Sequence, residues 1–476
     1  MSSPRASDAA AFRVADLLAG KEPWEVFGER IRRYEIHLNG SEVEITRGPV
    51  ALEGYDIRLF RPREDGMGVG NQSSNDFSPE GIHATLQDAE RSARYASFPT
   101  ARLDLPSGRG ATGGIVEVLD RGLWEYPMDS LENYVATLRQ AFEGRSGVAL
   151  SFGSVRATLV ETSICNSSGL RTGYGHTTVD IEMGVKASGG PEGPAPGEFW
   201  LNDSDRRLRP GELGQRVDEW CRFAEDVRRG RPPPTGEMAV VMPASVLAGI
   251  LPLVYAGRLT GTARLRGVPV KPGMKLAAEH VTVHDDGRLA WAPMSSPVDD
   301  EGAPQRRRLL VDRGVVSELL YDSLHAGAFD THTTGSGFRE SSSGFRTWYR
   351  FMQPVTVSPS TLTLAPGGGG TDAEIVEAAH EGIWIQEIGW SSPDPVSGAF
   401  GGEIRLGYRI ENGVLTEPIR GGTVGGIALA SEGASSLMTR IQAIGSKSAF
   451  FDSVSSPPIL VSSLTVGGEQ RADRPD

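Results

Sequence analysis

Apolar residues recur every three or four positions along several stretches of the first half of the chain. The clearest stretch ends near residue 229, and its apolar positions form one stripe: Val217, Trp220, Phe223, Ala224 and Val227. This spacing predicts an amphipathic helix. Start signals predict three more helices, over residues 7–18, 79–95 and 129–142. Each starts at or after a Ser or Asp that can cap its first turn.

Between these helices apolar and polar residues alternate, which is typical of strands with one buried face. The alternation is longest over residues 148–163 and resumes at 177–185. Shorter strands are expected at residues 34–38, 41–47, 56–60 and 114–118. The first half therefore predicts a mixed domain of helices and an antiparallel sheet.

The second half is dominated by strands. The apolar run after residue 236 reads as a buried strand, and helices are expected over residues 244–256 and 372–381. The remainder alternates strand-like stretches with Gly-containing corners at residues 285–287, 312–314 and 411–413. Such corners join antiparallel strands. We therefore expect an α+β fold class, with a strand-rich, barrel-like C-terminal domain.

Three consecutive prolines at residues 232–234 mark the clearest internal boundary. Proline cannot continue a helix and favours an extended connector. We predict an N-terminal α+β domain over residues 1–229, a connector over 230–236, and a β-rich domain over 237–476.

Composition narrows the functional classes. The net charge of −13 argues against a protein that binds nucleic-acid backbones, which needs a basic face. No apolar run approaches the ~18 residues that span a bilayer, and the first residues carry no signal-peptide pattern. Two cysteines exclude a disulfide framework. We expect a cytoplasmic protein that binds neither nucleic acid nor membrane.

The histidines offer no convincing metal site. His280 and His284 alternate with Val281 and Val283, which is strand periodicity. On a strand this interval spans about 13 Å, too far for one zinc with ligand bonds near 2 Å. His380 ends a predicted helix, where the helix dipole already explains it. We interpret these histidines as structural.

Two segments are candidates for lining a substrate cavity. Arg306, Arg307 and Arg308 form a basic run that is either a solvated strand edge or a subsite for a carboxylate. The loop at residues 333–339 has alternating glycines and polar tips, as cavity-lining loops often do, although a plain connector is equally compatible. Its candidate residues are Thr334, Ser336, Phe338 and Arg339. Neither Cys165 nor Cys221 has a histidine nearby in sequence, so we assign no catalytic thiol.

Several segments, in the same order along the chain, together resemble the TldD/PmbA family, also known as gyrase-modulator proteins. The most specific are an Asn-Ser-Ser-Gly turn, an Asp-Asp-Glu-Gly segment, a Thr-Gly-Ser-Gly loop and two closing motifs. They lie at residues 166–170, 298–302, 334–341, 410–413 and 464–468. The opening strands at 34–60, the helix start at 75–81 and the hairpin at 312–322 are also similar.

The resemblance implies two paralogous subunits, one of which binds zinc through a His-Glu-x-x-x-His helix and a later Cys. In this chain Pro252 stands in place of the first His, Leu253 in place of the Glu, and Gly257 in place of the second His. Residues 444–458 contain no Cys. The chain therefore resembles the metal-free TldE-type subunit, with no catalytic residue, metal ligand or cofactor of its own.

What the resemblance implies is a heterodimer with a zinc-bearing TldD-type partner that cleaves or trims extended peptides, including precursors of peptide natural products. This chain alone is then expected to be inactive. Two alternatives remain open: a stand-alone protein that binds peptides or a metabolite, and a repurposed biosynthetic enzyme of the same fold.

Overall fold

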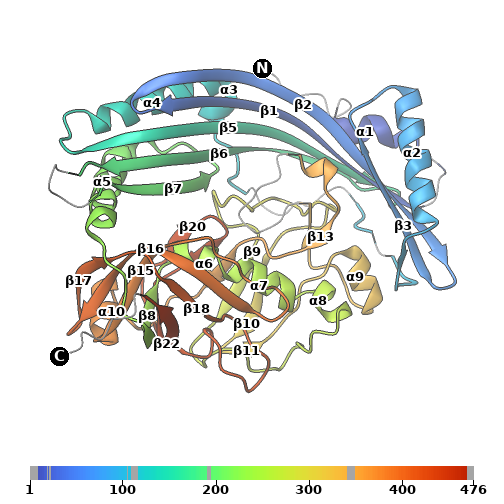
Figure 1. Cartoon of the computed structure of the whole chain (residues 1–476). Coiled ribbons are helices and arrows are strands. Elements are labelled where there is room, and N and C mark those ends of the chain that lie inside the picture. The colour runs from blue at the N-terminus through green and yellow to red at the C-terminus, as the bar shows by residue number, and fades with distance from the viewer. Residues whose placement is uncertain are drawn as a thin grey trace.

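The computed structural model describes residues 9–18, 20, 23–103, 105–108, 116–189, 195–339 and 349–468. Its first half is built on an antiparallel sheet of seven strands in the order β4-β3-β2-β1-β5-β6-β7 (Figure 1). The strands are β1 (Trp24–Asn39), β2 (Glu42–Arg63), β3 (Gly66–Ser74), β4 (Ser97–Phe98), β5 (Val148–Asn166), β6 (Arg171–Ala187) and β7 (Gly197–Asp205). The expected strands at 34–38, 41–47 and 56–60 are thus parts of β1 and β2, which are much longer.

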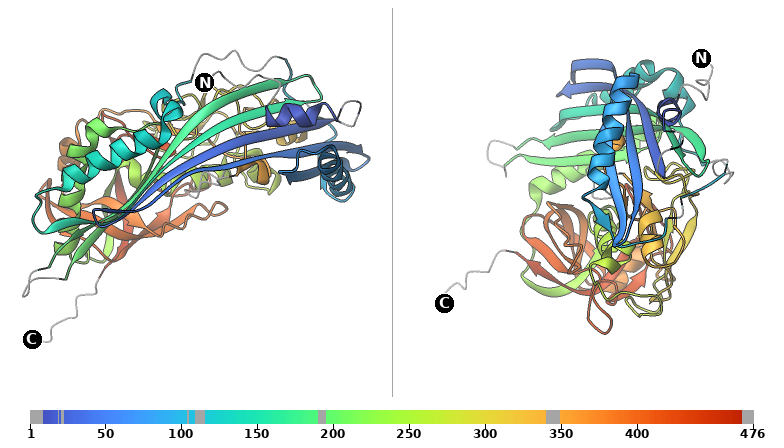
Figure 2. Two further views of the ribbon diagram at one scale, coloured as in Figure 1. Left: turned by 90° about the horizontal axis from the view of Figure 1, so that it is seen from above. Right: turned by 90° about the vertical axis from the view of Figure 1, so that its right-hand side faces the viewer.

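The helices of this half cover one face of the sheet. They are α1 (Ala10–Ala15), α2 (Pro79–Ala93), α4 (Pro127–Phe142) and α5 (Leu213–Arg229), with the short α3 (Arg121–Glu125) before α4. Figure 2 shows α1 and α4 lying across the sheet when it is seen from above. The apolar stripe predicted for α5 is buried against β6 and β7, and Ser78 caps α2 as expected.

Close packing of these helices explains one glycine. A Cβ atom on Gly28 in β1 would collide with the backbone of Ala10 and Ala11 in α1. Only glycine lets the helix lie this near the strand. The opposite face of β1 carries Glu25, Phe27 and Glu29, and it faces the C-terminal half.

The second half contains a closed barrel of five strands. β8 (Gly236–Met242) pairs with β22 (Ile459–Gly467), then β18 (Thr423–Ile427), β16 (Ala399–Glu411) and β15 (Gly382–Gly389) follow, and β15 returns to β8. β17 (Val414–Ile419) and β19 (Ile441–Ile444) extend it, and α10 (Asp372–Ala379) packs outside it. The barrel-like, α+β fold class predicted from the sequence is confirmed.

Beside the barrel lies a second sheet in the order β11-β10-β9-β14-β21-β20. Its strands are β9 (Val283–Asp286), β10 (Arg307–Asp312), β11 (Val315–Val316), β14 (Leu362–Leu364), β20 (Ala449–Phe451) and β21 (Val454–Ser456). The shorter elements are α6 (Ala244–Ala248), α7 (Leu251–Arg258), α8 (Gly261–Leu265), α9 (Ser323–Ala328), and the pair β12 (Gly337–Phe338) and β13 (Thr356–Val357).

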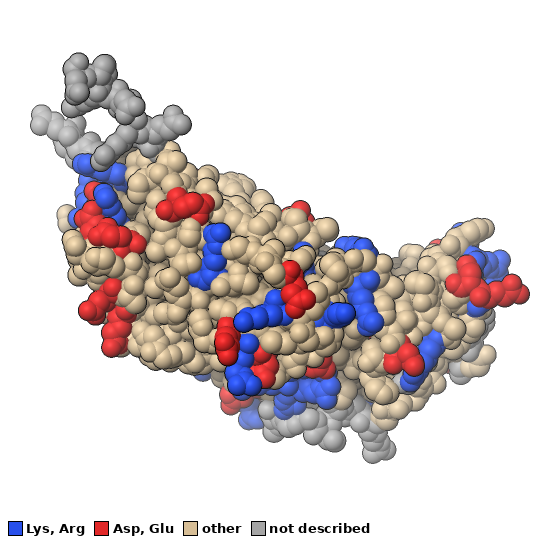
Figure 3. All heavy atoms as spheres, turned by 90° about the horizontal axis from the view of Figure 1, so that it is seen from below, with Lys and Arg blue, Asp and Glu red and all other residues tan. Residues whose placement is uncertain are grey.

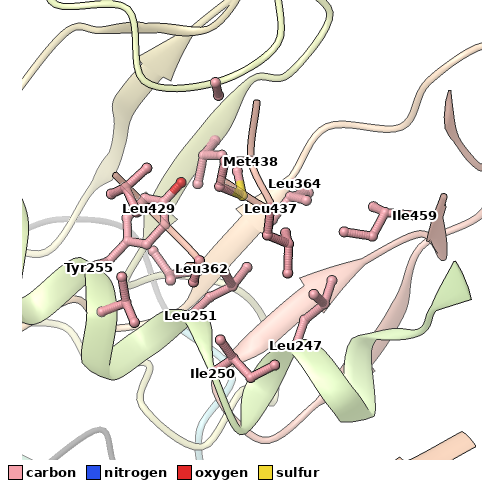
Figure 4. Close-up of a cluster of buried hydrophobic side chains, with 14 of the residues drawn as sticks. Leu247, Ile250, Leu251, Tyr255, Leu362, Leu364, Leu429, Leu437, Met438 and Ile459 are labelled. Carbon is pink, nitrogen blue, oxygen red and sulfur yellow. The ribbon is translucent and has the colours of Figure 1, made fainter. Parts of the chain in front are cut away.

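The largest core lies between the barrel, this sheet and α6–α7. In Figure 4 Leu247 of α6 and Leu251 and Tyr255 of α7 point toward Leu362 and its apolar neighbours. Each side chain of this kind contributes roughly 1.5–3 kcal/mol when fully buried. No helix in the described ranges is long and apolar enough to cross a membrane.

Several expected elements were wrong in detail. The helix expected over residues 244–256 is two helices, because Ile250 leaves the helical conformation (φ −122°, ψ −57°) and Pro252 starts a new turn. The strand expected to hold both His280 and His284 begins only at Val283, so His280 lies in the preceding turn. α1 is shorter than expected, and residues 116–118 form no strand.

Ser7 and residues 114–115 lie outside the described residues. The domain limits proposed from the sequence stay a prediction, although β7 lies in the first sheet, α5 packs on that sheet, and β8 lies in the barrel.

Candidate functional site

Helix α7 carries the positions at which the resemblance places a metal motif. Pro252 lies in the first turn of α7. Backbone N–H groups in a first turn have no intrahelical acceptor, so the N–H that proline lacks costs no hydrogen bond there. The proline therefore starts a helix and does not kink one. Leu251, Val254 and Tyr255 are fully buried on the inner side of α7, while Leu253 and Gly257 are partly exposed.

The outer side of α7 is covered by the loop of residues 390–398, which joins β15 to β16. A Cβ atom on Gly257 would collide with the carbonyl group of Pro395. The next residue, Arg258, donates a hydrogen bond of 2.7 Å from Nη1 to the carbonyl oxygen of Val396. The loop thus occupies the space that a histidine at position 257 would need.

Proline, leucine and glycine side chains carry no atom that can bind zinc. The residues at positions 252, 253 and 257 therefore do not fit the metal that the family resemblance implies. Across the described ranges, no group of three or more His, Cys, Asp or Glu side chains could hold a metal ion.

The cysteines lie in the other half of the molecule. Cys165 is in β5, where its thiol donates to the carbonyl oxygen of Ala11 at 3.4 Å, and Cys221 is on α5. Burial raises the pKa of Cys165 to about 12 and also raises the pKa of Cys221. Both environments disfavour the thiolate that a metal ligand or nucleophile requires.

Restoring the motif should therefore not restore a zinc site. We expect P252H/L253E/G257H to bind less than stoichiometric zinc, because no Cys completes the ligand set and the new His must displace the 390–398 loop. The overpacking should cost about 1–3 kcal/mol of stability. Metal analysis and thermal unfolding measure both effects.

The matched control is P252H/L253E, which keeps Gly257 and should keep most of the stability. Stoichiometric zinc in the triple variant, with an unchanged melting temperature, would contradict this account of α7.

The arginine triplet does not form one cluster. Arg306 and Arg307 have largely exposed side chains, whereas Arg308 is buried and lies 3.2 Å from Glu318. The alternation follows from strand β10, which begins at Arg307. On the face shown in Figure 3, basic and acidic residues are interspersed. The assignment of the triplet to a substrate cavity stays a prediction.

The loop at residues 334–339 is buried. The Thr334 hydroxyl accepts from the Tyr321 N–H at 2.7 Å and lies 2.8 Å from the Ser336 hydroxyl. Phe338 and Arg339 are 4% and 2% exposed. Its residues therefore hold the fold together in the single chain, and their place in a cavity stays a prediction. Residues 340 and 341 of this motif lie outside the described residues.

This loop is held against residues 299–301. Asp299 accepts hydrogen bonds from the N–H groups of Ala303, at 2.8 Å, and Gly337, at 3.0 Å. Asp300 accepts from the Arg339 N–H at 2.8 Å. The Asp-Asp-Glu-Gly segment and the Thr-Gly-Ser-Gly loop thus form one buried unit, although they are far apart in sequence.

The same unit binds the sheet through buried ion pairs. Arg58 in β2 lies 2.6 Å from Glu301. Arg350 bridges Glu29 in β1, at 2.7 Å, and Asp300, at 2.9 Å. We call this set the ionic clasp; its residues are Glu25, Glu29, Asp56, Arg58, Asp299, Asp300, Glu301, Arg339 and Arg350.

Arg339 joins the clasp to both sheet strands. Its Nη1 lies 2.8 Å from Asp56 in β2, and its Nη2 lies 3.5 Å from Glu25 in β1. Its guanidinium also lies over the Phe27 ring, with 4.8 Å between the guanidinium carbon and the ring centroid. Planar guanidinium groups suit such buried, multi-partner sites.

Carboxylates outnumber arginines in the clasp, and several of its carboxyl groups have raised pKa values. Burial is the largest effect: it raises the pKa of Glu25 to about 8, and it also raises the pKa values of Asp56 and Asp299. Both Glu25 side-chain oxygens lack a hydrogen-bond partner among the described residues. A neutral Glu25 carboxyl therefore fits this site better than a charged one.

Sequence reasoning found the 299–301 segment only through the family resemblance, and it missed the partners. The sequence pattern that points to these partners is in β1, where charged Glu25 and Glu29 alternate with apolar residues on a strand that is buried on both faces. Such charges need buried partners of opposite sign. The missed residues are Glu25, Glu29, Asp56, Arg58 and Arg350.

The clasp predicts a pH dependence of stability. Because the pKa of Glu25 is higher in the folded chain than its usual 4.5, the folded state binds the extra proton between about pH 4.5 and 8. The free energy of unfolding should therefore fall as pH rises through this window. In E25Q this pH-dependent fall in the free energy of unfolding, about a few kcal/mol over the whole window, should disappear.

Chemical unfolding across the window measures the slope, and E132Q on the exposed side of α4 is the matched control. An unchanged slope in E25Q would contradict the assignment of a neutral Glu25.

Part of this chain matches a known protein family. Residues 235–468 match the PmbA/TldA metallopeptidase C-terminal domain. The chain belongs to the TldD/PmbA family. This family is one of metallopeptidases, and the match covers the barrel, α7 and the clasp residues after 298.

Individual relatives are distant. A metalloprotease TldD homolog of Buchnera aphidicola is 26% identical over 240 residues, which are 48% of this chain and 46% of that protein. One from Haemophilus influenzae is 28% identical over 178 residues, 37% and 34% of the two chains. The matched region thus spans about half or less of these TldD/PmbA relatives.

The fold extends over nearly the whole chain. The crystal structure of TldE from Thermococcus kodakarensis superposes with a TM-score of 0.77 and covers 98% of this chain and all of that one. The sequence identity is 18%, so this likeness shows the TldD/PmbA fold alone.

Proposed function

We propose that this chain is the metal-free subunit of a TldD/TldE-type peptidase and that it pairs with a zinc-bearing TldD-type partner. One observation carries the proposal. In a chain of a metallopeptidase family, helix α7 has no ligand atoms at positions 252, 253 and 257, and the Pro395 backbone is packed onto Gly257. The fold likeness to a TldE and the TldD names of relatives support it.

In this arrangement a zinc ion held by the partner would supply an activated water for peptide hydrolysis. The present chain contributes the walls of a shared cavity and excludes folded proteins from it. An extended peptide is the expected substrate, because strand-like binding reads the backbone more than the side chains. Trimming of peptide precursors is one use of such an enzyme.

The proposed compartment is the cytoplasm. Cys165 and Cys221 are both buried and unbonded to each other, as suits a reducing environment.

Co-expression with a TldD-type protein from the same genome tests the proposal. We expect a stable complex that holds zinc and cleaves an unfolded, labelled polypeptide, and we expect a chelator to abolish cleavage. The purified single chain should neither hold stoichiometric zinc nor cleave.

The matched control is a complex whose partner has its motif glutamate changed to glutamine, which should assemble and stay inactive. Zinc-dependent cleavage by this chain alone would refute the proposal. Failure to form any complex would favour a stand-alone role.

A further inference from the structure

A pocket of about 470 Å³ lies where the first sheet, the end of α5 and the barrel meet. It is separate from α7 and from the ionic clasp. Its volume is within the usual range of small-molecule sites, about 300–1,000 Å³. The side chains that give it chemical character are Glu198, Trp200, Glu387, Glu403, Arg405 and Arg420.

The positive charge comes mainly from Arg420, which follows β17. Its backbone N–H donates to the Arg231 carbonyl at 2.9 Å, and its aliphatic stem lies beside Gly230 at the end of α5. These contacts fix the stem at the pocket wall. Its guanidinium forms no hydrogen bond or ion pair within the described ranges, whereas Arg405 already lies 3.3 Å from Glu403.

Two unpaired carboxyl groups lie on opposite walls of the pocket. Glu387 is in β15 of the barrel and Glu198 is in β7 of the first sheet. Neither side chain has a hydrogen-bond or ion-pair partner among the residues that the structure describes. Burial raises the pKa of Glu387 to about 8, against the lowering effect of Arg405.

An aromatic wall lies beside these charges. Trp200 is 48% exposed, and Phe152 holds its ring edge-on, with 5.5 Å between ring centroids. A large exposed indole next to charged groups is a common binding surface for small ligands, because it buries apolar area with little loss of side-chain freedom.

Partly buried charges that only stabilise a fold are normally paired, because an unpaired one loses hydration without compensation. Here an unpaired guanidinium group and two unpaired carboxyl groups face one pocket. We propose that this pocket binds a small zwitterion, a free amino acid or a short peptide. Its carboxylate pairs with Arg420, its ammonium group with Glu387 and Glu198, and its apolar part lies against Trp200.

The proposal does not depend on the proposed function, because no partner or metal takes part in binding. A ligand held by β7 on one side and β15 on the other also ties the first sheet to the barrel. Binding should therefore raise the melting temperature of the single chain.

Calorimetric titration of the full chain with L-alanyl-L-alanine tests the site. We expect saturable binding, and at least about tenfold weaker binding of the N-acetylated, C-amidated dipeptide, which lacks both charges. Near pH 8, R420Q and E387Q should each weaken binding of the free dipeptide by at least about tenfold.

R409Q is the matched control, since Arg409 lies in β16, pairs with Glu411 of that strand at 3.0 Å and does not line the pocket. Melting temperatures confirm that each variant folds. W200A tests the contribution of the aromatic wall without changing any charge. L-alanine alone separates the two sources: binding equal to the dipeptide indicates an amino-acid site, and much weaker binding indicates a peptide site.

The pH dependence of dipeptide binding is a second test of the site. Glu387 must lose its proton to pair with an ammonium group, so binding should be tighter near pH 8 than near pH 6. The other charged groups facing it are Glu198, Glu403, Arg405 and Arg420.

The proposal is overturned if no zwitterion binds saturably at millimolar concentration. It is also overturned if the capped dipeptide binds equally well, or if R420Q, E387Q and W200A all bind like the wild-type chain.

Discussion

The ion pair between Arg58 and Glu301 joins the first sheet to the C-terminal half at a place from which water is excluded. Around it, Arg339 and Arg350 make the same kind of contact between other strands and loops. Removing one partner of such a pair typically costs about 3–5 kcal/mol, because the other charge stays buried alone. The relative position of the two halves therefore depends on the ionic clasp.

The ionic clasp also fixes the conformation of the loop at residues 334–339. Its backbone N–H groups donate to Asp299 and Asp300, and Asp300 in turn pairs with Arg350, which also pairs with Glu29. The loop is thus a structural part of the junction. The pocket between β7 and β15 lies at another part of the same junction. A ligand bound there would hold the two halves together in addition to the ionic clasp.

The sequence predicted the elements well where one face of a helix or strand is buried. The α5 stripe, the β5 and β6 alternation and the cap at Ser78 all follow from local periodicity. Prediction failed where tertiary packing decides: Ile250 divides one expected helix, and the His280 turn precedes the strand. The site was harder, because the clasp joins residues more than 240 positions apart, and no local pattern encodes such pairs.

Position 257 shows how sequence and structure complement one another. The sequence shows that histidine is missing, and the structure adds that the Pro395 backbone fills the space. If catalysis belongs to a partner's metal, anomalous X-ray scattering from the assembled complex should locate one zinc site on the partner and none at α7 of this chain. Zinc bound at α7 would contradict it.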